Sequence, residues 1–143
     1  MAIKQLSVFL ENRPCQLVTI TDALAKEGIN IRAMSLADTQ DFGILRLIVN
    51  DPEHAREVLK ANDCVVRQNE VVVVAVEDKP GSLAEVSKIL AEHEVNIEYM
   101  YAFVTSSNKY AYVVLRVNQN ERAEELLSAR GIRPVTAEDI QKL

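Results

Sequence analysis

The sequence predicts an α+β fold of two βαββαβ units packed together, each an antiparallel sheet with its helices on one face. Three observations support this prediction: an internal repeat, apolar residues that alternate as in strands, and apolar residues three and four positions apart as in helices. A chain of 143 residues is long enough for two small cooperating cores. We therefore expect one domain over residues 1–69 and a second over residues 70–143.

The repeat joins residues that stand 66 positions apart in the first part of each copy. After a predicted turn the offset becomes 68, because TSSNKY is two residues longer than its counterpart near TQDFG. One supersecondary plan is therefore used twice, and its register slips only in a turn. The residues that recur unchanged in the second copy are Val8, Glu11, Leu17, Leu24, Ala25, Asn30, Ile31 and Met34 at offset 66, and Leu47, Val49, Ala55 and Leu59 at offset 68.

A strand and a helix open the first copy. Leu6, Val8 and Leu10 alternate with more polar neighbours, which is typical of a strand with one buried face. Leucine and isoleucine residues three and four positions apart follow, as on the inner face of a short helix that Gly28 closes.

A hairpin, a second helix and a last strand complete this copy. The segments 29–37 and 44–49 are β-branched and aliphatic, and the turn residues DTQDFG separate them. Pro52 then begins a helix, and CVVRQ provides the last strand. Right-handed crossovers turn this order into a four-stranded antiparallel sheet with two helices on one face, which is a ferredoxin-like unit.

The second copy repeats the plan, and a short element follows it. The sequence TAED predicts a capping box for a terminal half-turn or short helix that ends at Leu143. The corresponding segments of the second copy are VVVVAVE, LAEVSKILAEH, VNIEYMYAFV, YAYVVLRV, ERAEELLSA and IRPV.

The sheet face opposite the predicted helices is apolar. A face open to water is usually more polar, so we expect another sheet, from the partner repeat or from a second chain, to cover it. A homodimer is therefore the expected assembly. The residues of this face are Ile44, Ile48, Val71, Val73, Ala75, Tyr112 and Val114.

Charge and composition exclude several classes of partner. A net charge of −5 repels phosphate backbones and anionic membranes, so we expect neither nucleic acid nor membrane as a partner. The sequence begins without a leader pattern and contains no window apolar enough to span a bilayer, which predicts a cytoplasmic protein. Cys15 and Cys64 form neither a CxxC pair nor a cluster with histidine, so no disulfide framework, metal site or cofactor is expected.

The turn EDKPGS, between a strand and a helix, is the candidate binding site of the second copy. The first N–H groups of the helix lack an intrahelical acceptor, and the helix dipole favours an anion such as a carboxylate there. Gly81 would let a ligand approach the backbone and Asp78 would meet an ammonium group, so the two suit a zwitterion. The alternative is an ordinary turn, in which Pro80 and Gly81 fit the geometry and Ser82 caps the helix.

Two stretches carry a family resemblance: ENRPCQLVTITDALAKEGINIRAMSLA and EDKPGSLAEVSKILAEHEVNIEYMYAF each resemble an ACT domain. The motif is Pro-Gly-x-Leu after an apolar strand with Asn-Ile further on, and the resemblance covers nearly the whole chain. ACT domains are regulatory modules that bind amino acids and are found attached to enzymes such as aspartokinase. The resemblance implies a free-standing tandem ACT protein, which senses an amino acid and modulates a separate metabolic enzyme.

The resemblance also implies where a ligand binds. In that family it lies at an interface between two domains, held by the first strand-to-helix loop of one domain and second-strand residues of its neighbour. Cys15 stands where the second copy has Gly81, so the two sites need not be equivalent, and we expect the second loop to bind better. The residues carried over are Asn12, Arg13, Pro14, Cys15, Gln16 and Leu17 with Asn30 and Ile31, and Asp78, Lys79, Pro80, Gly81, Ser82 and Leu83 with Asn96 and Ile97.

Two other functions fit the same fold less well. A small ferredoxin-like enzyme such as an acyl phosphatase needs a phosphate-cradling loop with a paired Arg and Asn, and NRPCQL is a poor match. An RNA-binding module needs aromatic residues on the first and third strands and a basic face. This chain is acidic and offers only Tyr110 and Tyr112 there. We therefore expect neither of these two functions, and we expect a protein that is not an enzyme.

Overall fold

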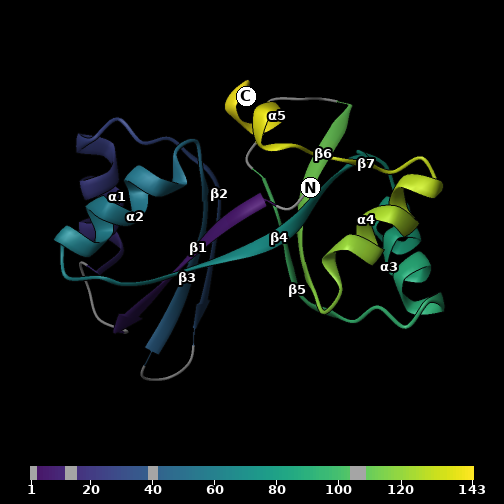
Figure 1. The fold of residues 1–143 in the computed structure, drawn as a ribbon, viewed down its shortest axis with the longest axis horizontal. Coiled ribbons are helices and arrows are strands. Elements are labelled where there is room, and N and C mark those ends of the chain that lie inside the picture. The colour runs from purple at the N-terminus through teal and green to yellow at the C-terminus, as the bar shows by residue number, and fades with distance from the viewer. Residues whose placement is uncertain (1–2, 12–15, 39–41, 104–108) are drawn as a thin grey trace. The chain divides into compact units, whose positions relative to one another are not determined.

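The computed structural model describes residues 3–11, 16–38, 42–103 and 109–143. These residues form two compact units (Figure 1). We call Lys4–Asn69 the first unit, and Glu70–Leu143 together with the N-terminal residues through Ile3 the second unit. The order of helices and strands confirms the predicted βαββαβ plan in both.

The first unit is a sheet with two helices on one face (Figure 1). Its elements are β1 (Ile3–Glu11), α1 (Gln16–Lys26), β2 (Ile31–Asp38), β3 (Phe42–Val49), α2 (Pro52–Ala61) and the beginning of β4 (Val65–Glu77). The strand order is β2-β3-β1-β4. Antiparallel pairing sets Val8 opposite Leu45 and Met34 opposite Leu47.

Local sequence explains where these helices begin and end. The Asp51 side chain caps α2 by accepting a hydrogen bond from the His54 N–H at 3.2 Å, and Pro52 stands in the first turn, where its missing N–H costs nothing. Gly28 ends α1 at a φ of +68°, as predicted, and the Ile29 N–H returns to the Leu24 carbonyl at 3.0 Å.

The core of the first unit lies between its sheet and its helices. The alternating residues of β1 and the inner stripe of α1 are buried in it, as the periodicity predicted. The buried residues are Leu6, Val8, Leu10, Ile20, Leu24, Ile29, Leu45, Leu47, Val49, Ala55 and Leu59.

The second unit repeats this architecture with the strand order β7-β4-β6-β5. Its further elements are α3 (Ser82–Glu92), β5 (Ile97–Ala102), β6 (Tyr110–Val117), α4 (Asn120–Ala129), β7 (Arg133–Pro134) and α5 (Ala137–Gln141). The core uses every buried position of the first core and adds Ile89 and Ile132. Its buried residues are Val72, Val74, Val76, Val86, Ile89, Leu90, Val95, Val113, Leu115, Val117, Ala123, Leu127 and Ile132.

β4 differs from the prediction because it is one continuous strand, whereas the sequence suggested that CVVRQ and VVVVAVE were separate strands. Asn69 and Glu70 lie between those segments, and neither is a glycine or proline that would break the extended backbone. Residues 65–69 therefore serve the first unit and residues 70–77 the second.

Residues of the predicted apolar face are buried to different degrees. Val71, Val73 and Val114 are buried, and Ile44 and Tyr112 are half-buried.

The predicted capping box is present at α5: the Thr136 hydroxyl accepts from the Asp139 N–H, and the Asp139 carboxylate accepts from the Thr136 N–H. Among the described helices, none is long and apolar enough to cross a membrane.

Candidate functional site

The loop between β4 and α3 holds the predicted site of the second copy in a tight turn. The Asp78 N–H donates to the Lys109 carbonyl at 3.0 Å, and the Lys79 N–H donates to the Glu77 carbonyl at 2.9 Å. Gly81 follows at a φ of +91° and a ψ of −13°, in the left-handed region that disfavours any residue with a Cβ. This glycine is therefore required by the backbone of the turn.

Gly81, and not Ser82, is the N-cap of α3. As a glycine it has no side chain with which to cap the helix, and Ser82 is the first helical residue. The ordinary-turn alternative, in which Ser82 caps the helix, is therefore wrong in this detail. Within the described residues, the N–H groups of Leu83 and Ala84 have no acceptor, so the positive end of the α3 dipole is open to an anion.

Charged side chains surround this helix end. Lys79 Nζ lies 2.7 Å from Glu77 Oε2, and both side chains are more than half exposed. This hydrogen bond lowers the pKa of Glu77 and raises the pKa of Lys79. Asp78 is exposed and has no salt bridge among the described residues, so its carboxylate is open to a ligand ammonium.

A pocket of about 290 Å³ lies beside the loop, within the second unit. It is bounded by the end of β4, the first turn of α3, the start of β6 and the turn between α4 and β7. Sequence reasoning missed this last turn, although the ferredoxin-like topology, in which the two helices are antiparallel, brings it to the beginning of α3. The lining residues are Ala75, Val76, Glu77, Lys79, Ser82, Glu85, Tyr110, Arg130, Gly131 and Ile132.

The first unit has a pocket of about 400 Å³ at the corresponding place. Every residue that lines the second pocket, except Lys79, has its counterpart at offset 66 or 68 in the first pocket. The counterpart of Lys79 is Arg13, which with Asn12, Pro14 and Cys15 lies outside the described residues. The matching residues are Phe9, Leu10, Glu11, Gln16, Thr19, Phe42, Asn62, Asp63 and Cys64, and Ile20 and Val65 complete the lining.

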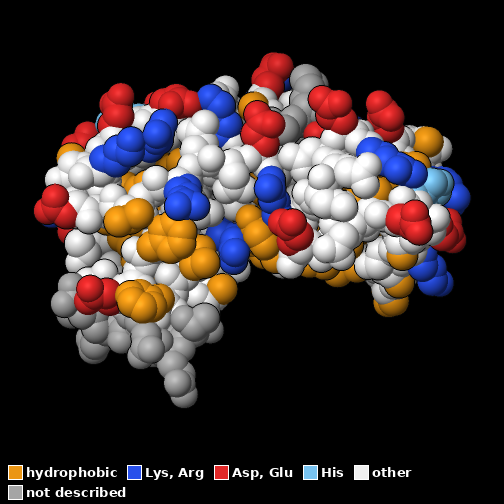
Figure 2. All heavy atoms as spheres, turned by 60° about the horizontal axis from the view of Figure 1, so that its bottom comes forward, with side chains coloured by type: hydrophobic (Ala, Val, Ile, Leu, Met, Phe, Trp, Pro, Cys, Tyr) orange, Lys and Arg blue, Asp and Glu red, His pale blue; other side chains and the backbone are white. Residues whose placement is uncertain are grey.

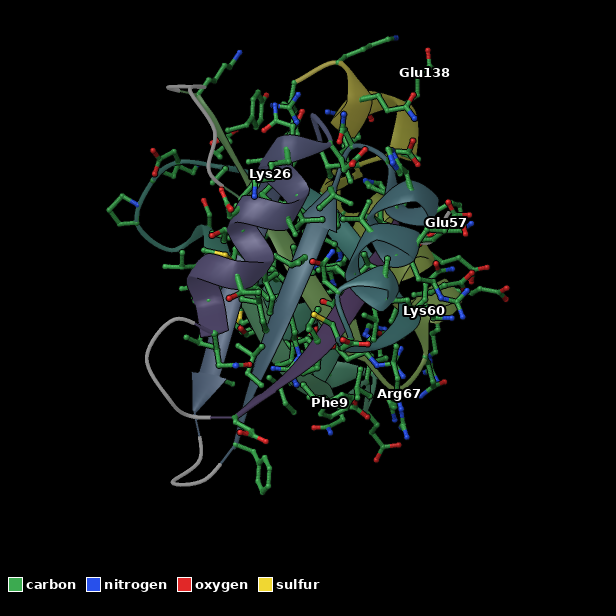
Figure 3. All side chains as sticks on the ribbon, turned by 90° about the vertical axis from the view of Figure 1, so that its left-hand side faces the viewer. Phe9, Lys26, Glu57, Lys60, Arg67 and Glu138 are labelled. Atoms are coloured by element: carbon green, nitrogen blue, oxygen red, sulfur yellow. The ribbon has the colours of Figure 1, made fainter. Side chains whose placement is uncertain are left out.

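The first pocket is the more apolar of the two. Phe9 and Phe42 are 40% and 63% exposed, and hydrophobic side chains gather over the first unit in the left half of Figure 2. The guanidinium of Arg67 lies 5.7 Å from the centre of the Phe9 ring, and Figure 3 shows the two side chains next to each other. Burial, and then the charge of Asp63, raise the pKa of the Cys64 thiol, so this cysteine is less reactive than a free one.

In each unit the strand-to-helix loop precedes the first helix, and the Asn-Ile motif follows that helix. The loop and the motif of one unit therefore lie at opposite ends of the helix. α3 begins after Gly81 and ends before Asn96, and its 11 residues span about 16 Å. A single unit therefore does not bring Asn96 and Ile97 together with residues 78–83, and the same holds for Asn30 and Ile31 with Gln16 and Leu17. Ile31, Ile97 and Leu17 pack against the cores.

Two asparagines that sequence reasoning overlooked hold the Asn-Ile motifs. Asn50 Oδ1 accepts a hydrogen bond from the Asn30 N–H at 2.9 Å, and Asn118 Oδ1 accepts one from the Asn96 N–H at 3.0 Å. Asn50 and Asn118 stand 68 positions apart, so the repeat contained the signal for this pair. In the described part of the chain, no group of three or more His, Cys, Asp or Glu residues is placed to hold a metal ion.

The chain is similar to known proteins in sequence and in structure. Residues 1–143 match the family described as an ACT domain pair. A crystal structure of protein BT0572 from Bacteroides thetaiotaomicron is 42% identical, with a TM-score of 0.92, over 100% of this chain and 98% of that one. The regulatory subunit of aspartate kinase from Thermus thermophilus shares the fold at 19% identity and a TM-score of 0.65, over 90% of each chain. The regulatory subunit of aspartate kinase from Thermus flavus shares the fold at 18% identity and a TM-score of 0.64, over 88% of each chain. No match was found among the curated proteins.

Proposed function

The chain belongs to the ACT domain pair family, and we propose that it is a non-catalytic regulatory protein that binds an amino acid at interfaces between ACT domains. Its domains are residues 1–69 and 70–143, and a homodimer supplies the neighbouring domains. Binding favours one arrangement of the domains and so changes the activity of a separate metabolic enzyme. Cytoplasmic location stays a prediction from the sequence.

The β4–α3 loop is the observation that carries this proposal. The left-handed Gly81 exposes the first N–H groups of α3, and Asp78 adds an exposed carboxylate two residues from Pro80. These groups complement the carboxylate and the ammonium of an amino acid. The proposed contacts are Asp78, Lys79, Pro80, Gly81, Ser82 and Leu83 with Asn96 and Ile97, and residues 12–17 with Asn30 and Ile31.

Thermal unfolding in the presence of each of the twenty amino acids at millimolar concentration tests this proposal. A ligand that binds only the folded state raises Tm, because it adds its binding free energy to stability. Asp78→Ala should abolish the rise for the amino acid that binds. Asp22→Ala, which removes the same charge from an exposed position on α1, should preserve it. A Tm that none of the twenty changes would contradict the proposal.

A further inference from the structure

The first unit carries a groove that runs along α1, which we call the α1 groove. One part of it is the pocket of about 400 Å³ bounded by Phe9 and Phe42, and the other is a pocket of about 330 Å³ between α1 and α2, which lie side by side (Figure 3). Thr19 and Asn62 line both pockets, so the two adjoin. Together they follow α1 along its 11 residues, a length of about 16 Å.

Bulky apolar side chains in this groove are open to solvent. All of them lie outside the described core of the first unit. Neighbouring exposed apolar side chains are uncommon on the surface of a protein that acts alone, and they mark sites of interaction. The four residues and their exposed fractions are Phe9 at 40%, Val18 at 65%, Phe42 at 63% and Val65 at 62%.

The repeat indicates that the fold does not need these four residues. The second unit forms the same βαββαβ plan with smaller or more polar residues at the matching positions. Core positions, by contrast, are apolar in both units. The exposed side chains of the α1 groove therefore serve a purpose other than folding. Their counterparts in the second unit are Ala75, Ala84, Tyr110 and Arg133.

Acidic side chains dominate the charge of the groove. Its lining contains four carboxylates and one ammonium group, and that ammonium, of Lys26, pairs with Asp22 at 3.1 Å. The guanidinium of Arg67 adds one cation beside the Phe9 ring. A second copy of the groove would set the same carboxylates against one another, so the charge favours a basic partner instead. The charged lining residues are Glu11, Asp22, Lys26, Glu27 and Asp63.

We infer that the α1 groove docks an amphipathic helix of a partner protein, with bulky apolar side chains on one face and lysine or arginine beside them. The apolar face would cover the exposed phenylalanine and valine side chains, and the basic residues would meet the carboxylates of the lining. A helix of about 11 residues matches the length of the groove. This inference goes beyond the proposed function, because docking of the helix requires no amino acid.

Fluorescence anisotropy of the full chain with a labelled peptide tests the inference. The probe is a peptide of about 14 residues made of leucine and lysine, with the leucines on one face of a helix. We expect saturable binding at one peptide per chain that weakens as sodium chloride is added, because salt screens the charges. A peptide of the same composition without an apolar face, and one with glutamate in place of lysine, should each bind at least about tenfold more weakly.

Substitutions that copy the second unit locate the binding. Phe9→Ala and Val65→Arg should each weaken binding about fivefold or more, because each removes an apolar contact and the second also adds a cation. Met100→Ala, at a position 38% exposed on β5, is the control and should leave binding unchanged. Asp63→Asn should weaken binding at low salt, whereas Glu121→Gln, on the exposed side of α4, should not.

Urea denaturation shows whether each variant is folded. Val18→Ala, a surface substitution that also copies the second unit, replaces any variant that does not unfold cooperatively, and it should weaken binding about twofold or more. Equal binding of the three peptides would overturn the inference, and so would affinity that none of the groove substitutions changes.

Sedimentation velocity distinguishes a partner helix from a second copy of the chain. Val65→Arg should leave the state of assembly unchanged. If it dissociates a dimer, a second copy occupies the groove and the inference is wrong. The amino-acid screen by Tm is independent of these measurements: if no amino acid raises Tm while the peptide binds at the groove, the proposed function fails and this inference stands.

Discussion

The two pockets occupy the same place in the repeat and offer different chemistry. In the second unit Glu85, Tyr110 and Arg130 make the lining polar and charged, while Thr19, Phe42 and Asn62 occupy these positions in the first unit. The core residues, by contrast, are apolar and buried in both units. The repeat therefore keeps the residues that form the fold, and it varies the residues that line the pockets.

The largest effect is expected where the two units are most alike. Leu24 and Leu90 correspond at offset 66, and both are 0% exposed. Leu24→Ala and Leu90→Ala should each lower the free energy of unfolding by about 2–5 kcal/mol, because each removes buried methyl groups and leaves a cavity. Denaturation in urea measures both losses. Val18→Ala, at a position 65% exposed on α1, is the control and should cost less than about 1 kcal/mol. A loss that small at either leucine would show that the two cores are not equivalent.

Much of this likeness was predictable from the sequence, and the pockets were not. The core of β1 could be predicted because every second residue of a strand with one buried face points away from water. The core of α1 could be predicted because apolar residues three and four positions apart lie on one face of a helix. The repeat then transferred the assignment to the second unit. Arg130 and Glu85 are 45 residues apart, and only the antiparallel packing of α3 and α4 brings their turns to one pocket. No local period carries that information.

The cap of α3 was misassigned for a physical reason. Serine is a common N-cap, but at this loop the chain needs a left-handed residue immediately before the helix, and only Gly81 adopts that conformation without strain. Ser82 then moves into the first turn and becomes buried. The Asn50 and Asn118 interactions were missed because each hydrogen bond joins the residue after one strand to the residue before the preceding strand, 20 and 22 positions away, and no local period marks such a pair.

The two loops differ in sequence at Gly81, where the first loop has Cys15. Gly81→Cys would give the second loop the residue of the first. The substitution should lower the free energy of unfolding by about 1–2 kcal/mol, since a residue with a Cβ is strained at a φ of +91°. An added Cβ would meet no atom within 4 Å, so a clash does not contribute. Ala84→Cys introduces the same thiol into helical backbone and should cost less than about 0.7 kcal/mol. Equal losses in urea denaturation for the two variants would contradict the argument from φ.

The asparagine pair tests whether the two units share more than their cores. Asn50→Ala and Asn118→Ala should each lower the free energy of unfolding by about 1 kcal/mol, because each removes the acceptor of one backbone N–H. Asn30→Ala and Asn96→Ala keep those backbone donors, so they should change stability by no more than about 0.5 kcal/mol. Urea denaturation of the four variants measures this. A clear difference between Asn50→Ala and Asn118→Ala would show that the motif is held differently in the two units.

The smallest expected effect belongs to α5, which follows the second βαββαβ plan and has no counterpart among the described elements of the first unit. The N–H of Thr136, at 2.9 Å, and then the Thr136 hydroxyl and Arg133 lower the pKa of Asp139. Because the folded pKa is the lower one, this stabilisation is complete above the unfolded pKa, near 4, and is lost as pH falls through the folded pKa.

Asp139→Asn removes this titrating group from the capping box. At pH 7 the substitution should lower the free energy of unfolding by no more than about 1 kcal/mol, the usual contribution of a cap, because solvent screens the ionic part. At pH 3 the difference from the unmodified chain should shrink, since the native carboxylate is by then partly protonated. Urea denaturation at both pH values measures the change. An equal loss at pH 7 and pH 3 would mean that α5 depends on the second acceptor oxygen of Asp139 and not on its charge.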